Sequence, residues 1–132
     1  MGYAERGMMR NARQTLGRLG EDLAVRHLQQ SGYVILQRNY RCPAGEMDIV
    51  ARQSERLAFV EVRTRRGSSY GTPKESITAR KQARLIRIAC SSLQEHRQSN
   101  ADWGIDAVAV RFSADGVLQD VEIIRNAVMG TG

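Results

Sequence analysis

Several features are scarce in this sequence, and each scarcity excludes a class of protein. No apolar run approaches the roughly 20 residues that a membrane-spanning helix needs. Residues 1–15 carry charged side chains but no hydrophobic segment, so they do not resemble a secretory signal. Cys42 and Cys90 stand alone without C-x-x-C spacing, which favours reduced packing residues over a disulfide or a zinc site. We therefore expect a cytoplasmic protein that does not bind membranes.

The size and composition indicate one folded domain. With 132 residues, of which 42% are hydrophobic and 26% charged, the chain can build one core but not two ordinary domains. We expect the domain to span residues 16–126, with mobile ends at residues 1–15 and 127–132.

Positive charge is concentrated in one stretch of the chain. The formal net charge is +6, and residues 63–97 contain nine basic side chains against two acidic ones, a net charge of +7 for that stretch. A localised basic region is typical of a protein that meets phosphates, although anionic membranes and acidic proteins would attract it as well. Eighteen of the 20 basic residues are arginine, which favours bidentate phosphate contacts but fits genome composition equally well.

Hydrophobic periodicity predicts an α/β fold with a mixed sheet flanked by helices. Helical spacing favours helices at residues 16–31 and 78–95. Strands are predicted at residues 33–36, 46–51, 57–63, 105–112 and 117–124, with connections at 39–45 and 67–73. The second and third strands are expected to form a hairpin that turns at Ser54 and Glu55, and the last two strands a second hairpin.

Two carboxylates lie inside the most apolar strands. Asp48 and Glu61 are flanked by aliphatic side chains and by Met47. A hairpin that turns between Ser54 and Glu55 would place these carboxylates opposite each other, with Cβ atoms about 4.5–5.5 Å apart. At that range they repel, and they must share a proton, find cations or bind a metal ion. A hard divalent cation such as Mg²⁺ suits two carboxylates in basic surroundings.

A purely structural interpretation of these acids stays open. The same register places Glu46 opposite Arg63, so the acids and this arginine would form an ion-pair patch on one sheet face without any chemistry. A slip of one residue would remove the pairing altogether. Another carboxylate inside a strand, Asp106, is expected to have a structural or supporting role.

Glu21 is a further candidate, on the first predicted helix. It lies at the flank of an apolar stripe that includes Ala24 and Leu28, from where it can reach the rim of the sheet. Gly17 and Gly20 each cost about 1 kcal/mol in a helix interior relative to alanine, and the close approach of another group would explain them. The alternative for Glu21 is a solvated helix acid.

The second predicted helix carries one basic stripe, because Arg80, Arg84 and Arg87 recur at i, i+4 and i+7. We call these three residues the arginine stripe. No helix-turn-helix, zinc-finger or RNP-type aromatic motif accompanies the stripe, and few aromatic side chains are available to stack on bases. These absences disfavour base-specific reading of a nucleic acid.

Five short motifs together resemble a known family. They are Gly20-Glu21 with Ala24, the run Gly45-Glu46-Met47-Asp48-Ile49-Val50-Ala51, the run Phe59-Val60-Glu61-Val62-Arg63, Tyr70-Gly71 with Pro73, and Lys81-Gln82. Their order and spacing resemble the bacterial YraN-like family, regarded as endonucleases, which is similar to archaeal Holliday-junction resolvases of the PD-(D/E)XK nuclease superfamily. The resemblance covers residues 16–110 and implies a restriction-endonuclease-like α/β core.

The resemblance also implies roles for individual residues. Asp48, Glu61 and the backbone carbonyl of Val62 would hold Mg²⁺ or Mn²⁺, with Glu21 contributing directly or through water. The position after Val62 is usually lysine in such enzymes and is Arg63 here. A guanidinium cannot act as a base near neutral pH, but it can stabilise charge that develops on the phosphate.

Metal-dependent endonucleolytic hydrolysis of DNA is thus the leading hypothesis, with branched DNA preferred and a homodimer suited to cutting two strands. The residues expected to contact phosphates are Arg65, Arg66, Arg80, Lys81, Arg84 and Arg87. Lys81 could instead supply the amine that Arg63 lacks, and Tyr70 could line the site. Two alternatives stay open: a nucleic-acid-binding module of the same fold that cuts poorly or not at all, and an interaction protein whose basic helix meets an acidic partner.

Overall fold

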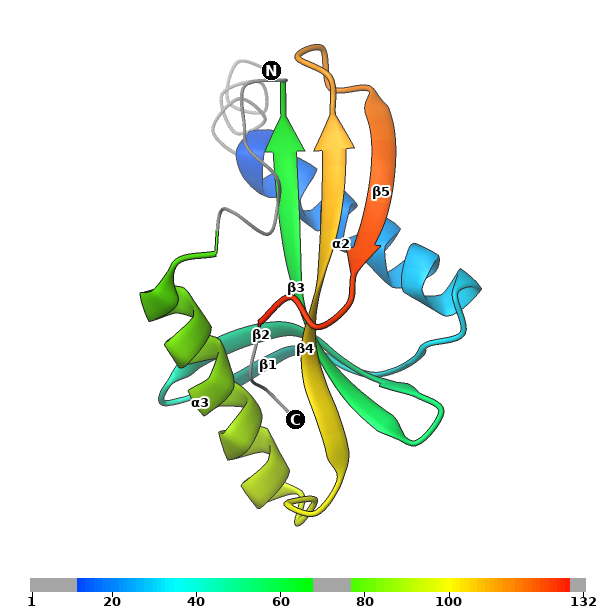
Figure 1. Cartoon of the computed structure of the whole chain (residues 1–132). Helices are drawn as coiled ribbons and strands as arrows, with labels where there is room; N and C mark the ends of the chain where they lie inside the picture. The colour runs from blue at the N-terminus through cyan, green and yellow to red at the C-terminus, as the bar shows by residue number, and fades with distance from the viewer. Residues whose placement is uncertain (1–11, 68–76, 129–132) are drawn as a thin grey trace, which may run out of the picture.

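The computed structural model describes residues 12–67 and 77–128. In chain order these form α2 (Ala12–Gln30), β1 (Val34–Cys42), β2 (Gly45–Gln53), β3 (Arg56–Arg66), α3 (Ala79–Glu95), β4 (Asp102–Phe112) and β5 (Leu118–Ile124). The strands build one sheet in the order β1-β2-β3-β4-β5, in which β3 and β4 are parallel and the other neighbours antiparallel (Figure 1). The predicted α/β fold with a mixed, helix-flanked sheet is confirmed, and it is consistent with a restriction-endonuclease-like core.

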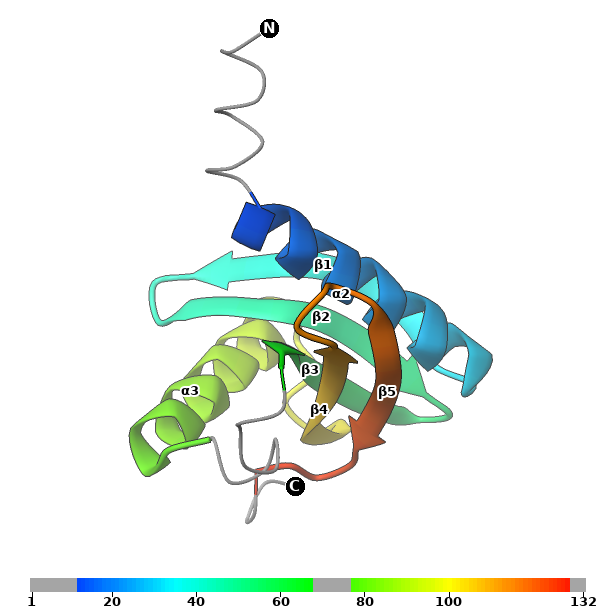
Figure 2. The same cartoon turned by 90° about the horizontal axis from the view of Figure 1, so that it is seen from above.

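The two helices cover opposite faces of the sheet, as Figure 2 shows. Leu28 of α2 packs in an apolar cluster that includes Val60, and Ile88 of α3 packs in a second cluster that includes Phe59. Val60 and Phe59 are consecutive residues of β3, so this strand is buried on both faces. Burial on both faces explains why β3 contains a continuous apolar run instead of an alternating pattern.

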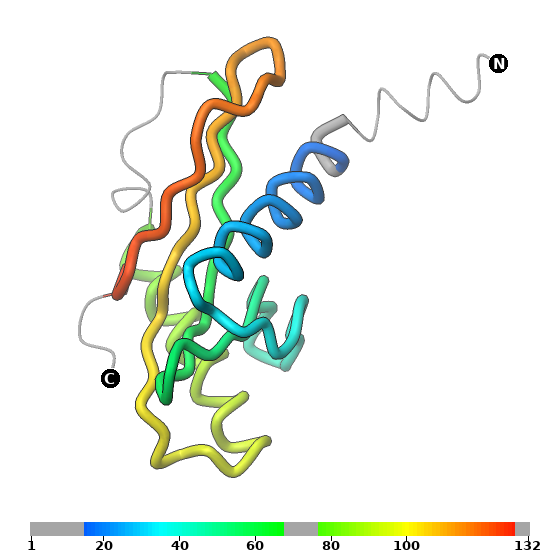
Figure 3. Tube along the Cα trace, turned by 90° about the vertical axis from the view of Figure 1, so that its right-hand side faces the viewer, coloured from blue at the N-terminus to red at the C-terminus, as the bar shows by residue number. Residues whose placement is uncertain are grey.

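The β2–β3 hairpin creates the feature that positions the candidate site. It turns at Ser54, whose φ of 54° lies in the left-handed region, and its register runs as predicted from Gln53 opposite Arg56 to Ile49 opposite Val60. Within the described ranges the ladder ends there, because β2 continues beside β1 while β3 continues beside β4. We call this divergence the fork. Figures 1 and 3 show β3 and β4 running together away from the β1–β2 pair.

One predicted connection is in fact a strand. Residues 39–45 are predicted to be irregular, but β1 extends to Cys42, and only Pro43 and Ala44 separate it from β2. β1 is an edge strand in which Tyr40 is the one fully buried residue, so the alternation that reveals a strand is absent from its sequence. The helix at 78–95 is confirmed, with Thr78 as the N-cap, and α2 begins at Ala12, before the predicted start.

A buried ion pair and its hydrogen bonds link four segments of the chain. Asp106 of β4 is 0% exposed and accepts hydrogen bonds from both terminal nitrogens of Arg56, at 3.0 and 2.8 Å. It also accepts from the Tyr33 hydroxyl at 3.0 Å and from the Asn126 backbone N–H at 2.9 Å. These donors lower the pKa of Asp106 against the opposing effect of burial. The structural role expected for Asp106 is therefore confirmed.

The chain ends and one loop fall partly or wholly outside the described residues. Residues 1–11, 68–76 and 129–132 are not described, so most of the predicted loop at 67–73, including Tyr70, lies outside the described residues. Mobile ends stay a prediction for residues 1–11 and 129–132, whereas residues 12–15 of the expected N-terminal end belong to α2. Ala127 and Val128, just beyond the expected domain end, are buried in the core. Neither described helix is long and apolar enough to cross a membrane.

Candidate nucleic-acid cleavage site

Asp48 lies at the fork, where the β2–β3 ladder stops. Its Oδ2 accepts a hydrogen bond of 2.7 Å from the Val62 backbone N–H, so the side chain bridges to β3 where the backbones have separated. Burial, and to a smaller extent the negative charges of Glu61, Glu21 and Glu46, raise the pKa of Asp48 to about 6 against the lowering effect of the hydrogen bond from the Val62 N–H. Asp48 is therefore a desolvated carboxylate among other acids.

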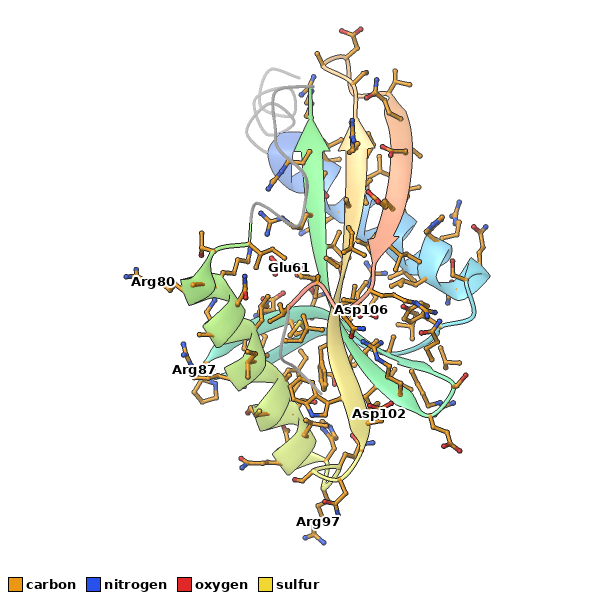
Figure 4. The ribbon with its side chains drawn as sticks, in the orientation of Figure 1. Glu61, Arg80, Arg87, Arg97, Asp102 and Asp106 are labelled. Carbon is orange, nitrogen blue, oxygen red and sulfur yellow. The ribbon has the colours of Figure 1, made fainter. Side chains whose placement is uncertain are left out.

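Glu61 lies beside the fork on β3 and is only 8% exposed (Figure 4). The Lys81 ammonium forms an ion pair with Glu61 Oε1, and Arg63 Nη1 lies 3.4 Å from the same oxygen. The second oxygen, Oε2, is buried and has no hydrogen-bond partner in the described part of the chain. An orphaned buried carboxylate oxygen is unfavourable, and it is the kind of atom that a bound cation would satisfy.

The helical spacing of α3 explains how Lys81 reaches this carboxylate. Leu85, Ile88 and Ala89 are buried against the sheet, and Lys81 precedes them by four, seven and eight residues, on the same face. The Thr78 side chain caps the helix by accepting a hydrogen bond of 3.2 Å from the Lys81 N–H, which holds this residue in the first turn. Its position beside Glu61 agrees with the alternative, left open above, in which Lys81 brings an amine to the site.

Arg63 is also part of the site but not through the predicted partner. Glu46 forms an ion pair of 3.2 Å with Arg41 of β1, not with Arg63. The predicted Glu46–Arg63 pair is wrong because β2 leaves β3 before either residue could face the other. Burial lowers the pKa of Arg63, while the charge of Glu61 raises it. The strand-to-strand pairing of Asp48 with Glu61 does not form either, since Asp48 bonds to Val62 instead.

Glu21 faces the sheet from α2 but is held by an arginine. Arg38 of β1 donates from Nε to Glu21 Oε1 at 3.1 Å and from Nη2 to Asp22 Oδ1 at 2.7 Å. The Glu21 side chain is 17% exposed, so it is not the solvated helix acid of the alternative interpretation. Arg38 was not predicted, because no pattern in the sequence connects β1 to α2.

The two helix glycines next to Glu21 differ from each other. A Cβ on Gly20 would overlap Oγ1 of Thr64 on β3, so close approach explains this glycine. A Cβ on Gly17 would meet nothing within 4 Å, and the predicted close approach is wrong at that position. The tight contact between Gly20 and Thr64 holds α2 against β3 at the level of the site.

Apart from Lys81, the predicted phosphate-contacting residues lie around the site rather than inside it. The arginine stripe is exposed, and Figure 4 shows Arg80 and Arg87 projecting from α3 away from the sheet. Arg66 is exposed and donates from Nε to the Ala114 carbonyl at 2.8 Å, and Arg65 is partly buried. The first turn of α3 holds Arg80 and Lys81 but no acidic residue, an arrangement that the helix dipole disfavours. The helix dipole therefore does not explain Arg80, whereas the ion pair with Glu61 accounts for Lys81.

The site offers oxygen ligands for a divalent cation, but few of them. No group of three or more His, Cys, Asp or Glu side chains in residues 12–67 and 77–128 is arranged to hold a metal ion. The two fork carboxylates supply hard oxygen donors, one of which, Glu61 Oε2, is orphaned. The residues thus fit a cation that takes its remaining ligands from water and substrate, as Mg²⁺ does.

Comparisons with known proteins place the chain among close relatives. The model of an uncharacterised protein family, UPF0102, matches residues 20–110. The chain is 49% identical over 121 residues to a UPF0102 protein of Desulfitobacterium hafniense (strain Y51), covering 89% of this chain and 98% of that protein. It is 47% identical over 115 residues to a UPF0102 protein of Acidothermus cellulolyticus, covering 85% and 87% of the two chains. The matched range contains every candidate site residue.

Proposed function

The chain belongs to the uncharacterised protein family UPF0102, and from its own residues we propose that it is a metal-dependent endonuclease that hydrolyses DNA phosphodiester bonds, with branched DNA preferred. We infer a relationship to the PD-(D/E)XK nuclease superfamily from the order of the motifs around Asp48, Glu61 and Arg63. The cytoplasm stays the predicted location.

The carboxylate pair at the fork is the observation that carries this proposal. Asp48 and Glu61 lie on strands that diverge; Glu61 is buried and Asp48 is partly buried. The pKa of Asp48 is raised to about 6. Removing charged groups from water costs folding free energy even when acids and bases pair. Clusters of such desolvated groups are common at functional sites. The orphaned Glu61 Oε2 supports cation binding by the same residues. When bound, Mg²⁺ or Mn²⁺ would offset phosphate charge and lower the pKa of an attacking water.

The basic side chains of the site would act on the substrate phosphate. Arg63 retains its positive charge at all working pH values, so it can stabilise charge on the phosphate but cannot remove a proton from water. Lys81 brings an ammonium to the same carboxylate from α3. Glu21 would contribute through its charge or through a water molecule, while Arg38 fixes its carboxylate. The Val62 carbonyl stays a predicted ligand.

The arginine stripe would hold the DNA backbone beside the site. Its three side chains are exposed on α3, the helix that also carries Lys81. Such contacts give affinity that weakens with salt, and they carry no sequence information. Recognition by shape suits branched DNA, and a homodimer would present two sites to two strands.

A nucleic-acid-binding module with weak or no cleavage is the second candidate. It is favoured by the ion pairs of Lys81 and Arg63 with Glu61, which already neutralise one of the two carboxylates in the described structure.

The test compares cleavage of branched and linear DNA in Mg²⁺ or Mn²⁺ by the wild type and by Asp48→Ala, Glu61→Ala and Arg63→Lys, with DNA binding measured in parallel. The nuclease proposal predicts that both alanine variants stop cutting but keep most of their DNA affinity, and that Arg63→Lys preserves or raises activity. Glu55→Ala, at the exposed hairpin turn, is the control and should cut normally. Tight DNA binding without cleavage in any divalent ion would support the binding module. No DNA affinity at low salt would contradict both and favour an acidic protein partner.

A further inference from the structure

We propose that Lys81 is a built-in counter-cation for Glu61 that exchanges with the divalent ion: the ion displaces the ammonium from the carboxylate, and the released lysine moves to a substrate phosphate. This inference rests on the proposed function, because it assigns Lys81 a place in that site.

The ion pair at Glu61 shows why an exchange is needed. Oε1 of Glu61 already contacts both the Lys81 ammonium and the Arg63 guanidinium, while Oε2 is buried without a described hydrogen-bond partner. A divalent ion on the orphaned Oε2 would lie close to the Lys81 ammonium on Oε1, because the two oxygens belong to one carboxylate. The ion would add two positive charges to a carboxylate that already contacts two cationic side chains, and their repulsion is strong in a poorly solvated place. One of the two basic side chains must therefore move when the ion binds.

Lys81 is the side chain that can move. Its side chain is 30% exposed, whereas that of Arg63 is only 9% exposed. Arg63 lies two residues from Glu61 on the same rigid strand, whereas Lys81 reaches over from α3 on a flexible four-carbon stem. Since a lysine ammonium is strongly hydrated and has no fixed bonding geometry, it can leave Glu61 for solvent or for another anion.

The released ammonium has a neighbouring destination. Lys81 stands in the first turn of α3, next to Arg80 of the arginine stripe, where the proposed function places the DNA backbone. The positive end of the helix dipole also favours a phosphate there. The exchange thus couples two events that the reaction needs, occupation of the carboxylates by the ion and an added positive contact to the phosphate.

The first experiment measures Mn²⁺ binding without DNA by calorimetry, on the full chain. Lys81→Met removes the competing charge at nearly constant length, and it should bind Mn²⁺ about five- to tenfold more tightly than the wild type. Arg80→Met is the matched control, since it removes a charge from the same helical turn without a described contact to Glu61, and its affinity should change less than about twofold. Lys81→Arg, which keeps the charge, should not tighten Mn²⁺ binding, and so separates the loss of charge from other effects of the substitution. Equal tightening in both Met variants, or none in Lys81→Met, would overturn the exchange.

The second experiment measures how DNA affinity depends on salt, first in EDTA and then in Ca²⁺ as a divalent ion. If Lys81 contacts phosphate only after exchange, the salt slopes of the wild type and Lys81→Met should coincide in EDTA and differ by about 0.9 in Ca²⁺. A difference in both conditions, or in neither, would overturn the release step. These readouts do not require cleavage, so a protein that shows the exchange but never cuts would contradict only the nuclease proposal. A protein that cuts without showing the exchange would contradict only this inference.

Discussion

Replacing Asp48 by asparagine is expected to stabilise the metal-free protein. The pKa of Asp48 is raised from 3.8 to about 6, chiefly by burial. At 1.36 kcal/mol per unit, a rise of about two units sets a ceiling of about 3 kcal/mol on the penalty of the ionised form. Because the carboxylate is partly exposed, we expect about 1–2 kcal/mol. Asparagine keeps an oxygen that can accept the Val62 N–H, so the variant removes the charge but not the hydrogen bond.

The effect must depend on pH in one direction. In the folded protein Asp48 keeps its proton up to about pH 6, whereas in the unfolded chain it ionises near pH 4. The folded state therefore binds more protons between these values, and the stability of the wild type falls as the pH rises through this window. The Asp48→Asn variant lacks the titrating group. Its advantage should be near zero at pH 4 and should reach a plateau above pH 7.

Urea unfolding in EDTA at several pH values measures this advantage directly. Glu55→Gln, which removes a charge at the exposed hairpin turn, is the control and should show no such trend. A variant that is no more stable than the wild type at pH 8, or an advantage that does not change with pH, would refute the conclusion that Asp48 is a desolvated acid. Mn²⁺ should then stabilise the wild type but not Asp48→Asn, because the variant lacks a charged ligand.

Three further predictions concern the scaffold and the basic surface. Arg56→Met should lower the free energy of unfolding by about 3 kcal/mol in urea, because it leaves Asp106 buried without its cation; a loss below 1 kcal/mol would contradict this. Gly20→Ala should lower the free energy of unfolding by about 1–2 kcal/mol despite the helix propensity of alanine, because the new Cβ would overlap Thr64. In a Thr64→Ala background the same change should cost nothing, and equal losses in both backgrounds would exclude this contact as the cause. Neutralising the whole arginine stripe should reduce the salt slope of DNA binding by about 2.7, and an unchanged slope would show that α3 does not face the DNA.

The hairpin could be predicted from the sequence, but the fork could not. The turn at Ser54 and Glu55 and the register up to Ile49 opposite Val60 follow from polar residues between two apolar runs. That register extrapolates to a direct pairing of Asp48 with Glu61, yet the strands separate one step earlier. Separation depends on which further strand each one pairs with, and this tertiary choice leaves no local pattern in either run.

The contents of the site were only partly predictable for the same reason. The sequence pattern of neighbouring strands and turns predicted that acids and bases gather around Glu61. Contacts between elements that are far apart in the sequence left no such pattern. Arg38 contacts Glu21 from β1, an edge strand whose sequence does not alternate between apolar and polar residues. Lys81 contacts Glu61 of β3 from α3. The spacing of Lys81 from Leu85 predicts that Lys81 lies on the buried face of the helix. The sequence does not distinguish its ammonium from that of a solvent-exposed lysine.

The fork leaves part of β3 with a neighbouring strand on one side only, within the described residues. Beyond Val60, the ladder to β4 continues to Arg66, while β2 has already turned away. A half-open ribbon of this kind is a template on which other chains can add strands, and natural proteins discourage such growth with charged side chains. Arg65 and Arg66 supply that charge. The same guanidinium groups that we assign to phosphates would thus also keep the protein from aggregating, and changing them to apolar residues would endanger solubility as well as activity.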